Sequence, residues 1–451
     1  MFEHLDDPAD VSPEPEALAR VMRRATAIRR RRMGAAAAAC VVLIGGATGF
    51  LVARPGPVHL STTETAFQFN SLPSPLPVGT SVPTTALVNV VFSTAADGFG
   101  LAAHQGKAVL AATTDGGNSW QVKDPTLPSG YGQNAGYPGQ FEFIGSTGYL
   151  WGGATEADGY QPLWITSDNG ASWHAASIGP VVHDVSAIGA NVWALTSDCV
   201  VKAEAGNPIA PCALVVEESD NNGATWINAS GGGFVQFPVA PTIDEHAELA
   251  RITQSRAYVL AAPGSSQPGQ DIGLIYTADA GVTWQTRPVP CAGAFDLGAE
   301  IAASSTDDLW LLCGSQPDSD LQSKELFRSS DGGLSWTLTA SATGAATPPP
   351  AVTQPNSLPL DGYIAPLTVG HKNLAVASST TAWLYPFRVA MVKTETGGRT
   401  WTTVSGLDTA GFSSGGTGNV TFISASQGWI CSYGVGLWHT SDGVHWFPLG
   451  T

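Results

Sequence analysis

Acidic side chains are the residues of this 451-residue chain best suited to chemistry, because 37 Asp and Glu outnumber 20 Lys and Arg. A pair of carboxylates at a suitable separation can hydrolyse a glycosidic bond, one as acid and the other as base or nucleophile. Four acids that we expect in loops are candidates for such a pair: Asp184, Asp244, Asp296 and Glu300. Their spacing selects no two of them, so a glycoside hydrolase stays an alternative and no catalytic residue is named.

Other chemistry leaves fewer traces in the sequence. The nine histidines, among them His183, His439 and His445, show no metal-ligand spacing. A phosphate loop, a nucleophile elbow and a Cys-x-x-Cys motif are all absent from the sequence. Beyond residue 53, 13 Lys and Arg face 31 Asp and Glu, a net charge of −18 that repels nucleic acid. We therefore expect no metal, no cofactor and no nucleic-acid partner.

A turn motif that recurs seven times, roughly every 45–65 residues, indicates the elements that must position these residues. Each copy follows an apolar run, begins with Ser or Thr, has glycine shortly after a central polar residue, and ends on Trp. The copies are Thr113–Trp120, Thr166–Trp173, Ser219–Trp226, Thr277–Trp284, Ser329–Trp336, Thr394–Trp401 and Thr440–Trp446. The central residue and the closing Trp are Asp115 and Trp120, Asp168 and Trp173, Asn221 and Trp226, Asp279 and Trp284, Asp331 and Trp336, Thr396 and Trp401, and Asp442 and Trp446.

The motif has a structural explanation. An Asp or Asn after a strand accepts hydrogen bonds from nearby backbone N–H groups and fixes a tight turn. The glycine adopts a conformation that other residues resist, and the Trp anchors the next strand in the core. The third and sixth copies depart from the pattern with Asn221 and Thr396, and the copy with Asp442 is one residue short. We expect all seven to be structural.

These stretches resemble the Asp-box (BNR) repeats of the sialidase superfamily. An F-x-x-x-x-x-G-W segment before a box, as in Phe422–Trp429, is similar to the photosystem II assembly-factor family and its bacterial relatives over about residues 88–450. The resemblance implies a β-propeller without catalysis; sortilin-type propellers with the same box bind peptides. The arginine triad and the Arg-Ile-Pro motif of sialidases have no match here, which leaves a sialidase-like or xyloglucanase-like hydrolase as the alternative.

Four short strands per repeat make one propeller blade, so the sequence predicts an all-β, seven-bladed β-propeller over residues 87–451. An aromatic residue is expected in the second strand of each blade. These residues are Phe99, Trp151, Trp193, Tyr258, Trp310, Trp383 and Trp429. With the seven box tryptophans and third-strand Trp164 and Trp438, the repeat accounts for all 14 tryptophans as core between blades.

The residues before the propeller predict its location. Residues 34–53 carry no charge over 20 positions, long enough for one transmembrane helix. Residues 1–33 form a basic tail whose Arg29–Arg32 keep the N-terminus in the cytoplasm and the propeller outside. Residues 54–86 read as a Pro/Ser/Thr-rich stalk, of which Thr65–Phe69 could add an outer strand to a blade. A cleaved signal peptide is the alternative to a cell-membrane anchor.

Six cysteines fit an oxidising compartment. Cys199 and Cys212 flank a loop of the third blade, and Cys291 and Cys313 are expected to pair across the first two strands of the fifth. Cys40 lies in the predicted span, and Cys431 is expected to be buried in a strand.

Three long insertions interrupt the blades: Pro125–Gly139, Asn228–Glu248 and Thr337–His371. Repeat proteins concentrate recognition in such loops on one face, although insertions are also tolerated without function. Their aromatic residues are our candidate contacts, namely Tyr131, Tyr137, Phe234, Phe237 and Tyr363. The sequence thus favours a membrane-anchored module of the bacterial envelope that binds an extracytoplasmic protein or glycan.

Overall fold

A computed structural model describes the chain from residue 69 onward with gaps. The described residues are 69–128, 131, 139–152, 162–179, 181–197, 214–229, 246–262, 272–291, 298–315, 321–342, 358–359, 362, 364, 373–386, 391–407 and 418–450. The predicted tail and membrane span, residues 1–53, lie outside them, as does the stalk up to residue 68. Among the residues described, no helix has the length and apolar character needed to cross a membrane.

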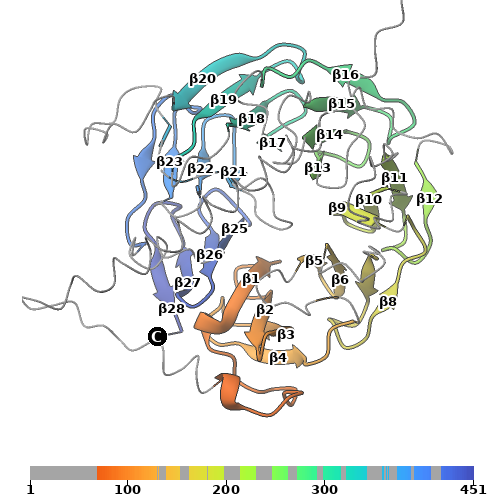
Figure 1. The fold of residues 1–451 in the computed structure, drawn as a ribbon, viewed down its shortest axis with the longest axis vertical. Helices are drawn as coiled ribbons and strands as arrows, with labels where there is room; N and C mark the ends of the chain where they lie inside the picture. Colours follow the sequence, from red (N-terminus) through yellow and green to blue (C-terminus); the bar gives the residue numbers. More distant parts are fainter. Residues whose placement is uncertain are drawn as a thin grey trace, which may run out of the picture. The chain divides into compact units, whose positions relative to one another are not determined.

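Seven antiparallel sheets of four strands are arranged as a ring, so the described chain is an all-β, seven-bladed propeller (Figure 1). Each blade uses four consecutive strands, the first nearest the centre and the fourth at the rim. The first four blades are β1 Leu87–Phe92, β2 Gly98–His104, β3 Lys107–Thr113, β4 Gln121–Asp124; β5 Gln140–Ile144, β6 Thr147–Trp151, β7 Trp164–Thr166, β8 His174–Ala175; β9 Val181–Ile188, β10 Asn191–Ser197, β11 Leu214–Ser219, β12 Ile227–Asn228; β13 His246–Arg251, β14 Ala257–Ala262, β15 Gly273–Thr277, β16 Gln285–Arg287. The last three are β17 Gly298–Ala303, β18 Leu309–Gly314, β19 Lys324–Ser329, β20 Thr337–Ala342; β21 Leu374–Val376, β22 Ala382–Leu384, β23 Val392–Thr394, β24 Thr402–Thr403; β25 Gly418–Phe422, β26 Gly428–Ser432, β27 Gly436–Thr440, β28 Phe447–Leu449.

Burial follows the position of a strand in its blade. The second strands β2, β10 and β18 are buried at every residue. They read as continuous apolar runs because a neighbouring blade covers each of their faces. First strands such as β1 are only partly buried, and the short fourth strands β8 and β24 are exposed. The core therefore lies between blades, not within one layer.

Aromatic rings fill these spaces between blades. Phe99 of β2 stacks on Phe143 of β5 with ring centroids 3.7 Å apart, and Trp383 of β22 stacks on Phe422 of β25 at 4.0 Å. A Cβ atom at Gly148 would lie 2.4 Å from the ring of Phe143, so this ring requires glycine there. Such stacked contacts add to the hydrophobic gain of burial and fix how one blade sits on the next.

The second blade corrects one predicted aromatic position. In the other blades the predicted aromatic lies opposite a fixed first-strand position, as Trp310 does with Ala302. In the second blade that place belongs to Tyr149, opposite Glu142, and Trp151 lies two residues further on, still buried. The turn Gly145–Ser146 has two residues, as does Gly189–Ala190 in the third blade, so turn length is not the cause. β6 carries two aromatic residues, Tyr149 and Trp151, and the sequence alone favoured the tryptophan.

The ring closes by packing between the first and last blades. β1 lies beside β25 and β26, and Phe92 stacks on Trp429 with centroids 3.7 Å apart. The amide of Asn419 accepts from Val90 N at 3.2 Å and donates to Val90 O at 3.1 Å. β25–β28 complete the last blade without a strand from the described residues 69–86, and Gly434 N donates to Thr85 O at 2.9 Å. Within the described ranges, the ring therefore closes through side chains and this backbone bond.

The described part of the predicted stalk packs on the propeller. Phe69, Leu76 and Val82 are buried in the core cluster of the first blade. Phe69 lies in a helical turn, so the outer strand proposed for Thr65–Phe69 is wrong at Phe69; residues 65–68 lie outside the described residues. Residues 79–82 instead run along the outer edge of β4, since Gly79 N donates to Val122 O and Val122 N donates to Thr80 O, both at 2.8 Å. A short 3₁₀ turn, η1 Thr84–Ala86, leads into β1.

Candidate functional site

The seven recurring turns, here called box loops, share one hydrogen-bond pattern. In the second copy the Thr166 hydroxyl donates to Asp168 Oδ1 at 2.7 Å and accepts from Gly170 N at 2.9 Å. Ser172 then donates to the same carboxylate through its N–H at 2.9 Å and its hydroxyl at 2.7 Å. The carboxylate of Asp168 is thus occupied by its own loop.

The copies that depart from the pattern keep these bonds with other atoms. Asn221 accepts from Thr225 N at 2.8 Å and uses its amide N–H to reach the Thr225 hydroxyl. Thr396 accepts from Thr400 N at 2.9 Å. In the short seventh loop, His445 donates to Asp442 Oδ1 through its N–H at 2.8 Å, and its ring Nδ1 lies 2.6 Å from Oδ2.

These bonds keep the box carboxylates ionised. The hydroxyl and N–H of Ser172, with the hydroxyl of Thr166, lower the pKa of Asp168 to about 2. The hydroxyl and N–H of Ser335 likewise lower the pKa of Asp331 to about 2. Hydrogen bonds to the charged form stabilise it. A carboxylate held in this state is a poor general acid at neutral pH, so the box loops are structural.

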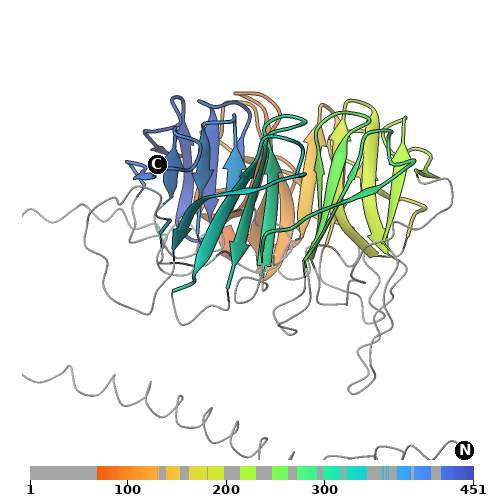
Figure 2. The ribbon, with the colours of Figure 1, turned by 90° about the horizontal axis from the view of Figure 1, so that it is seen from above.

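The two ends of the ring differ in what they carry (Figure 2). Every box loop joins a third strand to a fourth, so all seven lie at one end with the turns between first and second strands. Connections from second to third strands and from one blade to the next leave from the opposite end, here called the loop face. Described residues at the loop face are Gln105, Tyr131, Gly179, Lys324 and Tyr433. All three insertions join consecutive blades, so they depart from the loop face.

A ring of polar residues on the innermost strands was missed by the sequence reading. Each stands two residues before the residue paired with the second-strand aromatic, and an apolar residue follows it. The seven positions are Asn89, Gln140, Asp184, Glu248, Glu300, Asn373 and Asn419, of which Asn373 immediately precedes β21 and the others lie in first strands.

The acids of this ring tie blades together. Asp184 accepts from Leu249 N at 2.9 Å, and Glu248 accepts from Ile301 N at 3.1 Å. Glu300 accepts from Leu374 N and Asn373 N at 2.9 Å each, and from the Asn373 side-chain amide at 3.2 Å. Each bond crosses from one innermost strand to that of the next blade.

Two of the four candidate catalytic acids are therefore assigned to the framework. We expected Asp184 and Glu300 in loops, but they lie in β9 and β17, are at most 7% exposed, and accept backbone N–H groups. A carboxylate used in this way is not free to protonate a leaving group or to activate water. Asp244 and Asp296 lie outside the described residues.

Tyr131 is the one predicted contact residue that the structure describes, and it is withdrawn as a ligand contact. Its side chain is 3% exposed, packs in the core cluster with Leu127 and Phe141, and donates its hydroxyl to Gln140 O at 2.6 Å. Burial raises its pKa well above the ordinary value. Tyr131 thus fixes the first insertion to the blade. Tyr137, Phe234, Phe237 and Tyr363 lie outside the described residues.

Part of the third insertion is also fixed to the framework. Lys324 is fully buried, and its ammonium donates to Gln322 O, Pro359 O and Gly362 O at 3.0, 3.1 and 2.6 Å. A buried ammonium is stable only when its three donors are satisfied, as here. Gln322 accepts from Ile364 N at 2.7 Å. The first six residues of this insertion form β20, so its connecting part is shorter than we expected.

A disulfide joins Cys291 to Cys313, with Cα atoms 5.6 Å apart. Cys313 lies in β18, whereas Cys291 lies between β16 and β17 and not in a strand. The bond thus ties the connection between two blades to the second strand of the fifth. Cys431 is a buried free thiol in β26. Cys199 and Cys212 lie outside the described residues.

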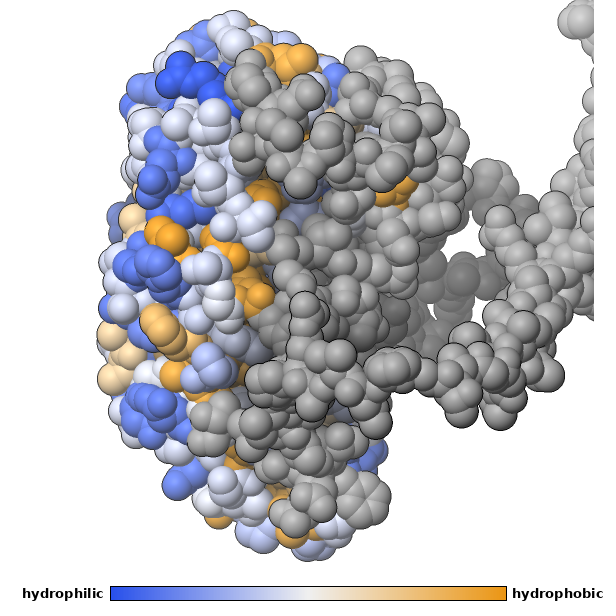
Figure 3. Space-filling view, turned by 90° about the vertical axis from the view of Figure 1, so that its left-hand side faces the viewer, coloured by the Kyte–Doolittle hydropathy of each residue, from blue (hydrophilic) through white to orange (hydrophobic). Residues whose placement is uncertain are grey.

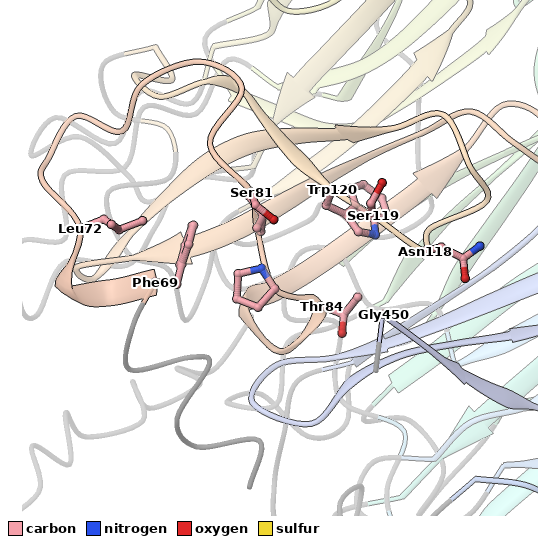
Figure 4. A pocket seen from close by; sticks show the side chains of 10 residues that line it. Phe69, Leu72, Ser81, Thr84, Asn118, Ser119, Trp120 and Gly450 are labelled. Atoms are coloured by element: carbon pink, nitrogen blue, oxygen red, sulfur yellow. The ribbon is translucent and has the colours of Figure 1, made fainter. Parts of the chain in front are cut away.

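Exposed groups at the loop face are few among the described residues. Tyr433, in the turn between β26 and β27, is 41% exposed and is a candidate aromatic position that the sequence did not single out. A cavity of about 420 Å³ lies between the segment before β1 and the first box loop (Figure 4). Phe69, Leu72 and Trp120 line it together with Asn118 and Gly450.

No group of three metal-ligating side chains occurs within the described ranges.

The fold defines the chain as a seven-bladed β-propeller with box loops. No protein-family model matches it, and no curated protein matches it. Among solved structures it is similar to "YCF48 bound to D1 peptide", with 16% identity and a TM-score of 0.49 over 80% of this chain and 96% of that chain. It is also similar to YCF48 from Cyanidioschyzon merolae, with 13% identity and a TM-score of 0.46 over 81% and 99%.

An enzyme is among the structural neighbours as well. The GH74 enzyme of Niastella koreensis shows 13% identity and a TM-score of 0.40 over 81% of this chain and 65% of that chain. Because propellers of one architecture serve unrelated functions, the function must be argued from the residues of this chain.

Proposed function

We propose that this chain is a single-pass envelope protein whose propeller binds an extracytoplasmic protein or glycan through the loop face. The observation that carries the proposal is the arrangement of the ring. All three long insertions depart from one end, while the box-loop Asp residues at the other end and the acids Asp184, Glu248 and Glu300 of the inner strands accept hydrogen bonds from backbone or hydroxyl groups. Residues 34–53 would anchor the protein, and Arg29–Arg32 would hold the N-terminus in the cytoplasm.

Binding is favoured over hydrolysis because the described candidate acids have structural partners. A glycosidase needs two carboxyl groups about 5–10 Å apart that face the substrate. Asp184 and Glu300 instead bond the backbone of the next blade. In contrast, Tyr131 and Lys324 fix the bases of two insertions, which gives a binding surface a rigid support.

The test uses the full-length chain in detergent and a panel of sialylated, plant and bacterial cell-wall glycans. Retained ligand and released sugar are both recorded. Retention without release supports a glycan-binding module. Release of sugar would replace the proposal with a hydrolase, and Tyr433→Ala would then serve to ask whether the loop face carries the activity. If glycans are neither retained nor cleaved, a protein is the partner, and crosslinking in native membranes identifies it.

A further inference from the structure

The outer strand of the fifth blade has an edge that no described residue pairs with, whereas the corresponding edge in the first blade is paired with residues 79–82 of the chain itself. β20 has six residues and is the longest outer strand described. In the first blade, residues 79–82 pair with the outer edge of β4 through both backbone groups of Val122. An outer strand of this propeller is therefore able to take up a further extended segment.

β20 matches β4 in register. Leu338 stands two residues after its box tryptophan, as Val122 does, and it pairs with Phe327 where Val122 pairs with Ala111. Both strands then carry an irregularity at the same place. The backbone N–H and C=O of Leu338 consequently face outward. Its side chain is 50% exposed, whereas Val122 is 1% exposed.

The other end of β20 is already used. Ser341 O accepts from Leu358 N at 3.2 Å, so, counting only partners in the described ranges, the unpaired part of this edge runs from Thr337 to Thr339. In the last blade the matching position is Pro448, paired with Trp438, and proline offers no N–H for an added strand. Over residues 337–339, the described part of the chain thus gives the fifth blade neither a paired segment, as in the first blade, nor a proline, as in the last.

A cavity of about 420 Å³ adjoins this edge, lined by β20, the end of β19 and the sixth box loop. Its polar lining includes Arg328, Arg399, Ser330, Thr337, Thr380 and Thr396, and no acidic residue is among the described residues that line it. On this side of the ring, hydrophobic residues occur in separate groups between hydrophilic ones (Figure 3). The rim is therefore suited to a short segment with mixed side chains.

The charge of this cavity is unusual for an acidic chain. The sixth box loop has Thr396 where five other loops have Asp and one has Asn221. It has Arg399 where the others have Asn118, Ala171, Ala224, Val282, Leu334 and Val444. Arg399 is exposed, and its Nε donates to Thr396 O at 3.1 Å, while its terminal nitrogens bond no residue in the described ranges. Arg328 is held over the Trp310 ring at 4.4 Å and paired with Asp308, so Arg399 carries the available positive charge.

We propose that the edge of β20 binds an extended peptide by strand addition, with a carboxylate of the peptide against Arg399. The backbone of Leu338 would supply the strand hydrogen bonds, and Arg399 would supply the preference for an acidic residue. In strand addition generally, backbone bonds provide the affinity and side-chain contacts provide the specificity. This site is at the rim and is separate from the loop face. It does not depend on the function proposed for that face.

The test uses the full-length chain in detergent and fluorescein-labelled heptapeptides of alternating Thr and apolar residues. Their central residue is Asp, Glu or Lys, and anisotropy gives the affinity. We expect the acidic peptides to bind at least tenfold more tightly than the lysine peptides, and Arg399→Gln to remove most of that difference because a charge-assisted bond is lost. Arg256→Gln, a change in a turn of the fourth blade, serves as the matched control.

Leu338→Pro removes the outward N–H and should abolish binding, while Thr286→Pro, at the matching position of β16, should leave it unchanged. Pro448 indicates that an outer strand tolerates proline here, and tryptophan fluorescence verifies folding. Bound peptide should slow amide exchange at Leu338. Equal binding of acidic and lysine peptides, absence of any binding, or unchanged exchange at Leu338 would each overturn the proposal.

Discussion

Removal of the Glu300 carboxylate is the sharpest test of how the blades are held together. The side chain is 1% exposed and accepts two backbone N–H groups and one amide N–H from the next blade. In Glu300→Ala these three donors lose their acceptor in a buried place. An unsatisfied buried donor costs about 1–3 kcal/mol, so we expect a loss of about 3–5 kcal/mol in the free energy of unfolding. Glu300→Gln keeps one acceptor oxygen and should lose about half as much.

The assay is urea denaturation followed by tryptophan fluorescence, with amide exchange at Leu374 as the local readout. Asp307→Ala removes an exposed carboxylate of the same blade and should change stability by no more than about 0.5 kcal/mol. The reasoning is refuted if Glu300→Ala costs less than about 1 kcal/mol and the Leu374 amide stays as protected as before.

Three further predictions concern the box loops, the Lys324 ammonium with its three carbonyl acceptors, and the disulfide. Because the folded-state pKa of Asp168 is about 2, below the ordinary 3.8, its contribution to stability is complete above about pH 4 and is lost as the pH falls toward 2. Asp168→Asn, which has the residue found at Asn221 in the third loop, should fold well and lose this acid sensitivity. Asp168→Ala should be less stable at pH 7. An acid titration followed by tryptophan fluorescence distinguishes the two variants from the wild type. Lys324→Met leaves three buried carbonyls without a donor and should lower the free energy of unfolding by about 3 kcal/mol. Amide exchange around Lys324 should become faster. Unchanged exchange would show that the ammonium does not hold the insertion. Replacing Cys291 and Cys313 with Ala opens a link across 22 residues and should cost about 3 kcal/mol in urea denaturation, and a loss below 1 kcal/mol would contradict a stabilising role.

The box loops made the architecture predictable because their chemistry is local. The hydroxyl, the Asp and the glycine of a box act on one another within five residues, so each copy carries its own signature. Even the copy with Thr396 keeps the bond to the N–H four residues on. Counting such units therefore gave the number of blades without any knowledge of how the blades pack.

The ties between blades escaped prediction because their partners are backbone groups far away in the sequence. Glu300 meets Leu374 across 74 residues, and a backbone N–H has no sequence signature. The ring also mixes Asp, Glu, Asn and Gln, since each can accept a hydrogen bond. Its only local signal is a polar residue before an apolar one in each first strand. We took Asp184 and Glu300 for possible catalytic acids for this reason.

The candidate binding loops failed at Tyr131 for a different reason. Surrounding Gly and Pro residues predicted an exposed loop, but nearby apolar residues give its ring a buried place and Gln140 supplies an acceptor for the hydroxyl. The opposite error occurred at Tyr433, which lies in a short turn and was overlooked. Exposure of a single aromatic depends on packing partners that the sequence does not identify.

Photo-crosslinking in native membranes determines which end of the ring contacts a partner. A photoreactive amino acid is placed at Tyr433 or Lys107 of the loop face, or at Ala171 or Val282 of the box end, in the full-length chain. All four positions are exposed, so reagent access is comparable. We predict a discrete protein or glycan adduct from the loop face and none from the box end. An adduct confined to the box end would contradict the assignment of the loop face as the binding surface.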